Sequence, residues 1–148
     1  MKVKVTPSKV HGNVKIPASK SMAHRALICA SLSDGTSIVS NVTNSKDIEA
    51  TVGCMKALGA KIKQIDETTY EVTGTNLFKQ EGNITCNANE SGSTLRFLIP
   101  LAACTNAKVK FLGQGRLLQR PMDVYENEFK YDFDVEGRVG VGAAGMTV

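Results

Sequence analysis

The sequence predicts a mixed α/β fold of the α+β kind, in which β-α-β-α-β-β units repeat and about two units are present. Stretches with helical apolar spacing alternate with short stretches rich in β-branched residues. This order of helices and strands recurs along the chain. The first helix starts at Lys20 and its counterpart at Gly92, and the strand starts Ala60 and Tyr131 are separated by almost the same number of residues. A chain of 148 residues with 42% hydrophobic and 22% charged residues is also typical of a folded domain.

The first unit is expected over about residues 14–75, preceded by a separate strand segment over residues 1–13. Apolar and polar residues alternate from Val3 to Ile16, which predicts an extended chain. Ser45 and Gly59 are typical of a helix N-cap and of a helix C-terminal stop. The predicted elements of this unit are a helix over 20–32, a strand over 36–42, a helix over 46–58, and strands over 60–65 and 69–73.

The second unit is expected over about residues 76–148. Its predicted elements are a strand over 83–87, a helix from Gly92, a strand over 108–112, a helix opened by Pro121, and a strand over 131–135. Residues 140–145 match the dinucleotide-binding pattern G-x-G-x-x-G, but only three residues follow them. That pattern requires a following helix and a downstream acidic residue, so we expect an irregular tail instead.

The composition argues against several classes of function. A net charge of +4 with three Tyr, five Phe and no Trp is too little charge and aromatic surface for a typical nucleic-acid binder. No apolar run approaches the roughly 18–20 residues of a membrane span, and the N-terminus has no apolar signal core, so a cytoplasmic protein without a membrane partner is expected. The four cysteines lack Cys-x-x-Cys spacing, which favours structural thiols, most of them in apolar surroundings, over a zinc site.

The segment from Pro17 to Arg25 is the strongest candidate for a binding site. If Ser19 caps a helix, the exposed N–H groups of the first turn and the helix dipole favour a bound phosphate or carboxylate. Lys20 adds a point charge, and Ser21 lies on the same helix face as Arg25, whose guanidinium binds such anions bidentately. His24 is expected to be a surface or packing residue rather than a ligand contact. The alternative for the whole segment is a solvated basic face.

Two later segments have the same character. Gly92 follows small polar residues at a helix start, where it lets a ligand approach the backbone closely. The alternative there is an ordinary capped, buried helix, in which Pro100 is expected to cause a kink. Arg120 precedes a proline and is therefore expected to be extended, at the positive end of the helix that follows it, where it would bind a third anion.

Four segments of the sequence carry a recognisable pattern. They are Lys15-Ile-Pro-Ala-Ser-Lys-Ser-Met-Ala-His-Arg-Ala26, Ser45-Lys-Asp-Ile48, Asn89-Glu-Ser-Gly-Ser-Thr-Leu-Arg96 and Arg116-Leu-Leu-Gln-Arg-Pro-Met122. Together they resemble the 5-enolpyruvylshikimate-3-phosphate (EPSP) synthase family, also called 3-phosphoshikimate 1-carboxyvinyltransferases. The resemblance covers about residues 3–130, and its Ser-Lys-Ser-x-x-x-Arg element distinguishes this family from the UDP-N-acetylglucosamine enolpyruvyl transferases.

This resemblance implies an activity and a role for each candidate residue. The family transfers the enolpyruvyl group of phosphoenolpyruvate to shikimate 3-phosphate, in chorismate and aromatic amino acid biosynthesis, and it is the target of the herbicide glyphosate. By resemblance, Lys20 is catalytic and contacts both substrates, while Ser21 and Arg25 contact shikimate 3-phosphate. Gly92 and Arg120 contact phosphoenolpyruvate. No metal or organic cofactor is implied, and the protein contributes mainly electrostatic stabilisation.

The resemblance also implies that this chain is one part of a larger site. Family members are more than twice as long and have two domains of three units each. Residues 1–13 are expected to pair with the other domain, and residues 14–148 to form an incomplete N-terminal domain. The chain alone is therefore expected to be inactive, with the C-terminal half or a second copy as its partner. The alternatives are a non-catalytic anion-binding or partner-docking fragment, and a piece of a UDP-sugar enolpyruvyl transferase.

Overall fold

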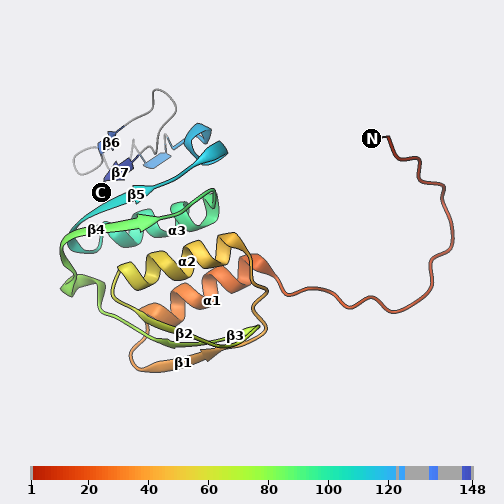
Figure 1. Cartoon of the computed structure of the whole chain (residues 1–148), viewed down its shortest axis with the longest axis horizontal. Coiled ribbons are helices and arrows are strands. Elements are labelled where there is room, and N and C mark those ends of the chain that lie inside the picture. The colour runs from red at the N-terminus through yellow and green to blue at the C-terminus, as the bar shows by residue number, and fades with distance from the viewer. Residues whose placement is uncertain (1, 123, 126–133, 137–144, 148) are drawn as a thin grey trace.

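The computed structural model describes residues 2–122, 124–125, 134–136 and 145–147. Three helices form a middle layer, with a β-sheet on each side of it (Figure 1). This arrangement confirms a mixed α/β fold. The number of repeated units is not decided by it and stays a prediction.

The three helices are α1 (Lys20–Leu32), α2 (Lys46–Ala57) and α3 (Gly92–Ala102). Each follows a serine whose hydroxyl accepts a hydrogen bond from the N–H group three residues further on. Such a cap satisfies one of the N–H groups that a helix start leaves without an intrahelical partner. The capping residues are Ser19, Ser45 and Ser91. Because these signals are local, the predicted starts of the three helices agree with the structure.

The first sheet is antiparallel, with β3 (Thr69–Thr73) between β1 (Thr36–Val39) and β2 (Lys61–Asp66). The strand predicted over 36–42 ends earlier, at Val39. Asn41 takes a φ of 58°, in the left-handed region that ends regular strand geometry and that asparagine tolerates well.

The second sheet begins with β4 (Glu81–Asn87) and β5 (Asn106–Leu112), which pair in parallel and are joined through α3. A parallel pair requires such a crossover, and it brings the carboxyl ends of both strands to one edge. The sheet continues antiparallel through β7 (Gly145–Thr147) to β6 (Asp134–Glu136).

The C-terminal part departs from two sequence predictions. Residues 145–147 form β7 rather than irregular chain, because the edge of β5 offers backbone hydrogen bonds that composition does not reveal. Pro121 does not open a helix directly, since residues 121 and 122 are not helical while residues 124 and 125 are. A 3₁₀-helix, η2 (Gly115–Gln119), precedes them instead, and another, η1 (Leu77–Lys79), precedes β4. Residues 126–133 and 137–144, which include the rest of the predicted helix and most of the glycine-rich pattern, lie outside the described residues.

Pro100 lies inside α3, and the helix continues through it. A proline has no N–H group, so the carbonyl of Arg96, one turn earlier, lacks its usual helical donor. The Tyr125 hydroxyl donates to this carbonyl at 3.1 Å and replaces the missing bond. Residue 125 therefore ties the segment after η2 to the solvent side of α3.

The core lies between the helix layer and the two sheets. Its fully buried side chains include Leu27 of α1, Ile48 and Met55 of α2, Leu98 of α3 and Phe111 of β5. Of the three cysteines that the sequence places in apolar surroundings, Cys54 is buried as expected, but Cys29 and Cys104 are exposed. Cys86, for which no burial was predicted, is also buried. Among the described residues, no helix is both long and apolar enough to cross a lipid bilayer.

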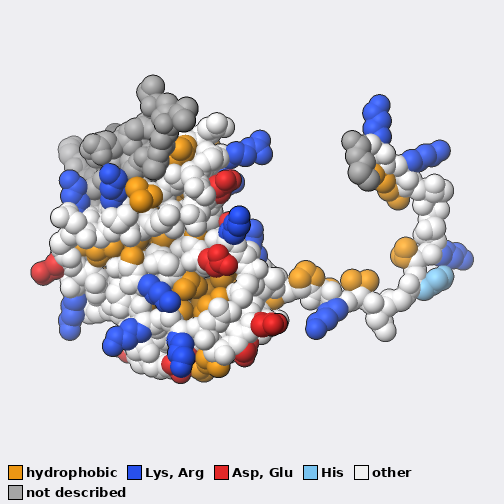
Figure 2. Space-filling view, viewed as in Figure 1, with side chains coloured by type: hydrophobic (Ala, Val, Ile, Leu, Met, Phe, Trp, Pro, Cys, Tyr) orange, Lys and Arg blue, Asp and Glu red, His pale blue; other side chains and the backbone are white. Residues whose placement is uncertain are grey.

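The N-terminal residues form an arm that leaves the body near the start of α1 (Figure 1). Apolar side chains are displayed along this arm (Figure 2), and Val5 and Val10 are 83% and 90% exposed. The described residues of the arm, 2–19, contain no strand, although their apolar and polar residues alternate as in a strand. Its extended, unpaired apolar residues are consistent with the expected pairing partner outside this chain, which stays a prediction.

Candidate anion-binding site at the helix starts

The starts of α1, α2 and α3 lie at the same end of the molecule, where the arm joins the body (Figure 1). The carboxyl end of β4 leads into the start of α3, so this is also the edge where the parallel strands end. Each helix start carries partial positive charge from its unpaired N–H groups. Three such starts on one edge create a surface that favours anionic ligands.

The α1 start carries Lys20, Ser21 and Arg25, all exposed. Nη1 of Arg25 donates to the carbonyl of Ser21 at 3.0 Å. The Arg25 guanidinium carbon also lies 5.0 Å from the centre of the Phe97 ring on α3, within the range of a cation–π contact. These two contacts fix the guanidinium between α1 and α3.

Lys20 is tied to the start of α2. Its ammonium group donates to a carboxylate oxygen of Asp47 at 2.6 Å, and the two side chains are 54% and 33% exposed. Solvent weakens such a pair, so a bound phosphate or carboxylate can compete with Asp47 for the lysine. Asp47 belongs to one of the four segments that resemble the family, but the sequence analysis assigned it no role in the site. Its position in the first turn of the predicted second helix was the signal that could have placed it there.

Gly92 and Arg120 are in direct contact at the start of α3. A Cβ atom placed on Gly92 would lie only 2.5 Å from Nη1 of Arg120, so the guanidinium rests against the glycine backbone. Arg120 is extended, with φ −75° and ψ 138°, as predicted. Its N–H group donates to the carbonyl of Leu117 at 3.1 Å, and the buried Leu117 side chain anchors this turn. The structure thus brings Arg120 to the start of α3, whereas the sequence prediction had placed it at the start of its own helix.

The predicted residues therefore form two groups at one end of the molecule. Lys20, Ser21 and Arg25 form the α1 group, and Gly92 and Arg120 form the α3 group. The contact between Arg25 and Phe97 links them.

A buried row of polar side chains lies beneath these groups. Nδ1 of His24 lies 2.7 Å from the Thr51 hydroxyl, which lies 2.7 Å from the Thr94 hydroxyl, which donates to Ser91 at 2.7 Å. All four side chains are buried. The sequence analysis did not predict that Thr51 and Thr94 take part in the site. His24 proves to be a packing residue, and its place among the apolar residues of α1 was the signal for burial.

Burial lowers the pKa of His24 below its ordinary value of 6.5. The nearby positive charges of Lys20 and Arg25 lower this pKa further, while the Asp47 carboxylate opposes them. The imidazole is therefore neutral at neutral pH, and it forms part of the packing between α1 and α2.

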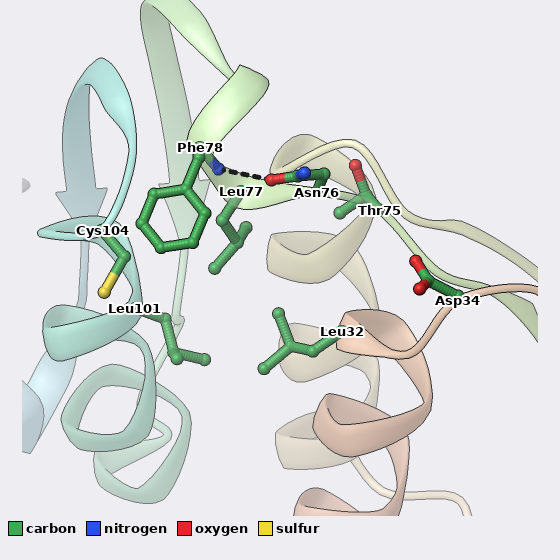
Figure 3. A pocket seen from close by; sticks show the side chains of 8 residues that line it. All are labelled: Leu32, Asp34, Thr75, Asn76, Leu77, Phe78, Leu101 and Cys104. Atoms are coloured by element: carbon green, nitrogen blue, oxygen red, sulfur yellow. Dashed lines mark hydrogen bonds between the residues drawn. The ribbon is translucent and has the colours of Figure 1, made fainter.

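A separate groove of about 370 Å³ lies at the other end of the helices (Figure 3). It is bordered by the last residue of α1, by η1 and by the C-terminal end of α3. The described residues that line it are mostly apolar and include no lysine or arginine, so they do not suit an anion. The lining residues are Leu32, Asp34, Thr75, Asn76, Leu77, Phe78, Leu101 and Cys104.

Replacing Gly92 by alanine should displace the Arg120 guanidinium, because the new Cβ and Nη1 cannot both stay where they are. The Arg120 Nε–H signal in ¹H–¹⁵N NMR should shift in this variant. Gly53→Ala is the matched control, since a Cβ on Gly53, inside α2, meets no described atom within 4 Å beyond its chain neighbours and its own helix backbone. An Arg120 signal that is the same in both variants would contradict the contact.

The stability of the chain should fall as the pH drops below 6.5. Below this pH the imidazole of residue 24, with its ordinary pKa of 6.5, binds a proton in the unfolded chain, whereas the lowered pKa of His24 keeps it neutral in the folded chain. Proton binding therefore favours the unfolded state. The dependence should not exceed about 1.4 kcal/mol per pH unit, the limit for one proton. Urea unfolding at a series of pH values measures it, and His24→Asn should flatten the dependence just below 6.5. An equally steep dependence in that variant would assign it to other groups.

Comparison with known proteins identifies the family. A sequence model of EPSP synthase (3-phosphoshikimate 1-carboxyvinyltransferase) matches residues 4–141. A 3-phosphoshikimate 1-carboxyvinyltransferase of Clostridium perfringens (strain SM101 / Type A) is 49% identical over 140 residues, which cover 91% of this chain and 33% of the relative. One from Clostridium kluyveri is 48% identical over 128 residues, which cover 86% of this chain and 30% of the relative.

A solved structure agrees at the level of the fold. EPSP synthase from Acinetobacter baumannii superposes with a TM-score of 0.73 at 19% sequence identity, over 92% of this chain and 32% of that one. This chain therefore spans about a third of the length of the proteins it matches. Because the family match extends over most of its residues, the chain belongs to the EPSP synthase family.

Proposed function

We propose that this chain supplies the N-terminal, substrate-binding part of an enzyme that transfers the enolpyruvyl group of phosphoenolpyruvate to shikimate 3-phosphate. The observation that carries the proposal is the gathering of two cationic groups, one at the start of α1 and one at the start of α3, on a single edge. Two anionic substrates that must react with each other need two such groups side by side.

In this proposal the α1 group binds shikimate 3-phosphate. The Ser21 hydroxyl and the Arg25 guanidinium act as donors to the anion, and the Phe97 ring keeps the guanidinium in place. Lys20 lies between the two substrates and leaves Asp47 when they bind. Because the lysine is already held near the site by this ion pair, little additional ordering is required of it.

The α3 group binds phosphoenolpyruvate. The N–H groups of Gly92 and Ser93 lack intrahelical acceptors and can donate to its phosphate, as can Arg120. The reaction is an addition followed by an elimination that releases phosphate. Fixed cationic groups beside the reacting atoms stabilise the charge that develops in the transition state, without reorganisation of solvent.

The chain alone is proposed to bind but not to turn over its substrates. It spans about a third of its relatives, so the general base and other basic groups of the site come from the remaining two thirds. Binding of the two anions without catalysis is therefore what this proposal expects of the chain alone, and it does not require a separate function.

The direct test is a chimera in which this chain replaces the matching third of the Clostridium perfringens relative. Phosphate release from shikimate 3-phosphate and phosphoenolpyruvate should be robust for the chimera and absent for the chain alone. Lys20→Ala and Arg25→Ala in the chimera should each lower kcat/KM by about a hundredfold or more, since each removes a charge that faces the reacting groups.

Lys56→Ala is the control, because Lys56 is an exposed cation in the last turn of α2, away from the helix starts. Near-normal turnover in either site variant would remove that residue from the site. A folded chimera without activity would contradict the proposed function, and turnover by the chain alone would contradict the need for a further part.

A further inference from the structure

The buried polar row His24–Thr51–Thr94–Ser91 connects all three helices directly beneath the site. His24 belongs to α1, Thr51 to α2 and Thr94 to α3, and Ser91 is the cap of α3. The three successive contacts are each 2.7 Å, a usual distance for a well-formed hydrogen bond between hydroxyl groups. Apolar packing alone would hold the three helices together but allow them to slide along their own axes. Hydrogen bonds are directional and fix the position of each helix relative to the others.

Asp47 connects this row to the surface. Its backbone carbonyl lies 3.2 Å from both the Thr51 and the Thr94 hydroxyls, while its carboxylate pairs with Lys20. The row therefore extends from the cap of α3, beside Gly92, to the lysine at the start of α1.

Both threonine hydroxyls can also donate to the Asp47 carbonyl at 3.2 Å, but one arrangement of protons fills all three of the 2.7 Å contacts. Each threonine hydroxyl has a single proton to donate. Thr94 donates to Ser91, so the proton between Thr51 and Thr94 belongs to Thr51. Thr51 must then accept from His24, which places the imidazole proton on Nδ1. Nε2 is the ring atom that finds no hydrogen-bond partner in the described part of the chain, and in this arrangement it bears no proton.

We propose that His24, Thr51, Thr94 and Ser91 are positioning residues that set the separation between the α1 and α3 anion groups. They touch neither substrate; they act by holding the two helix starts in a fixed relation. This inference rests on the proposed function for its effect on substrate affinity, but its structural part does not depend on any substrate.

The test compares Thr94→Val, which keeps the shape but removes the hydroxyl, with Thr94→Ser, which keeps the hydroxyl. Both are made in this chain and studied by ¹H–¹⁵N NMR and by calorimetric titration with shikimate 3-phosphate. Thr94→Val should shift the amide signals of residues 20–25 on α1 and weaken binding about tenfold, because it removes the hydroxyl that links α2 to the cap of α3. Thr94→Ser should resemble the unsubstituted chain in both respects.

Ser31→Ala is the matched control, because Ser31 carries a buried hydroxyl on α1 whose one partner in the described part of the chain is the carbonyl of Leu27, in the same helix. It should change neither the signals of residues 20–25 nor the affinity. If Thr94→Val does not fold, Thr51→Val interrupts the row one step earlier and carries the same expectations. In the unsubstituted chain, the ¹⁵N shifts of His24 should show the tautomer with the proton on Nδ1.

Three results would overturn the inference: a proton on Nε2, unchanged α1 signals in a folded threonine-to-valine variant, or a Thr94→Ser variant as impaired as Thr94→Val. If the unsubstituted chain shows no binding of shikimate 3-phosphate, the proposed function fails instead. The amide shifts and the tautomer still decide whether the row positions the helix starts.

Discussion

The structure depends on keeping three helix starts together although their partial positive charges repel one another. The Asp47 carboxylate, in the first turn of α2, lies among these charges and reduces the repulsion. Beneath it, the buried hydroxyls of Thr51 and Thr94 hold the helices by directional hydrogen bonds in surroundings where an unpaired polar group is costly. The remaining positive potential faces outward, and a bound anion would reduce it further.

This constraint explains why glycine and arginine occur together at the start of α3. The Arg120 guanidinium adds another positive charge to an already positive helix end, a placement that is electrostatically unfavourable by itself and favourable for an anionic ligand. It can approach the helix backbone because Gly92 has no side chain. In the same way, Arg25 lies over Phe97, which supplies an attractive surface for a cation without neutralising it. Both groups keep their charge for a ligand, as the proposed reaction of two anions requires.

Much of the fold follows from local sequence signals, and the parts that do not follow depend on contacts between distant residues. Ser19 and Ser45 predicted the starts of α1 and α2 as N-caps, and the small polar residues before Gly92 predicted the start of α3. The strand-like stretches of the sequence predicted β1 to β5. The C-terminal β7 was missed because an open sheet edge, not its own composition, makes it a strand. Likewise, Lys20, Arg25 and Gly92 were found from residue type at a helix start. The roles of Asp47, Thr51 and Thr94 were not, since their partners lie on other helices.

The most direct test of this account is a ¹H–¹⁵N NMR titration of the chain with inorganic phosphate. The account predicts that signals from the first turns of α1 and α3, at residues 20–22 and 92–94, move together, because both starts belong to one anion-binding edge. Signals around the apolar groove near Leu101 should stay fixed. Movement confined to the groove, or to exposed lysines away from the helix starts, would contradict the claim that these starts form a single site.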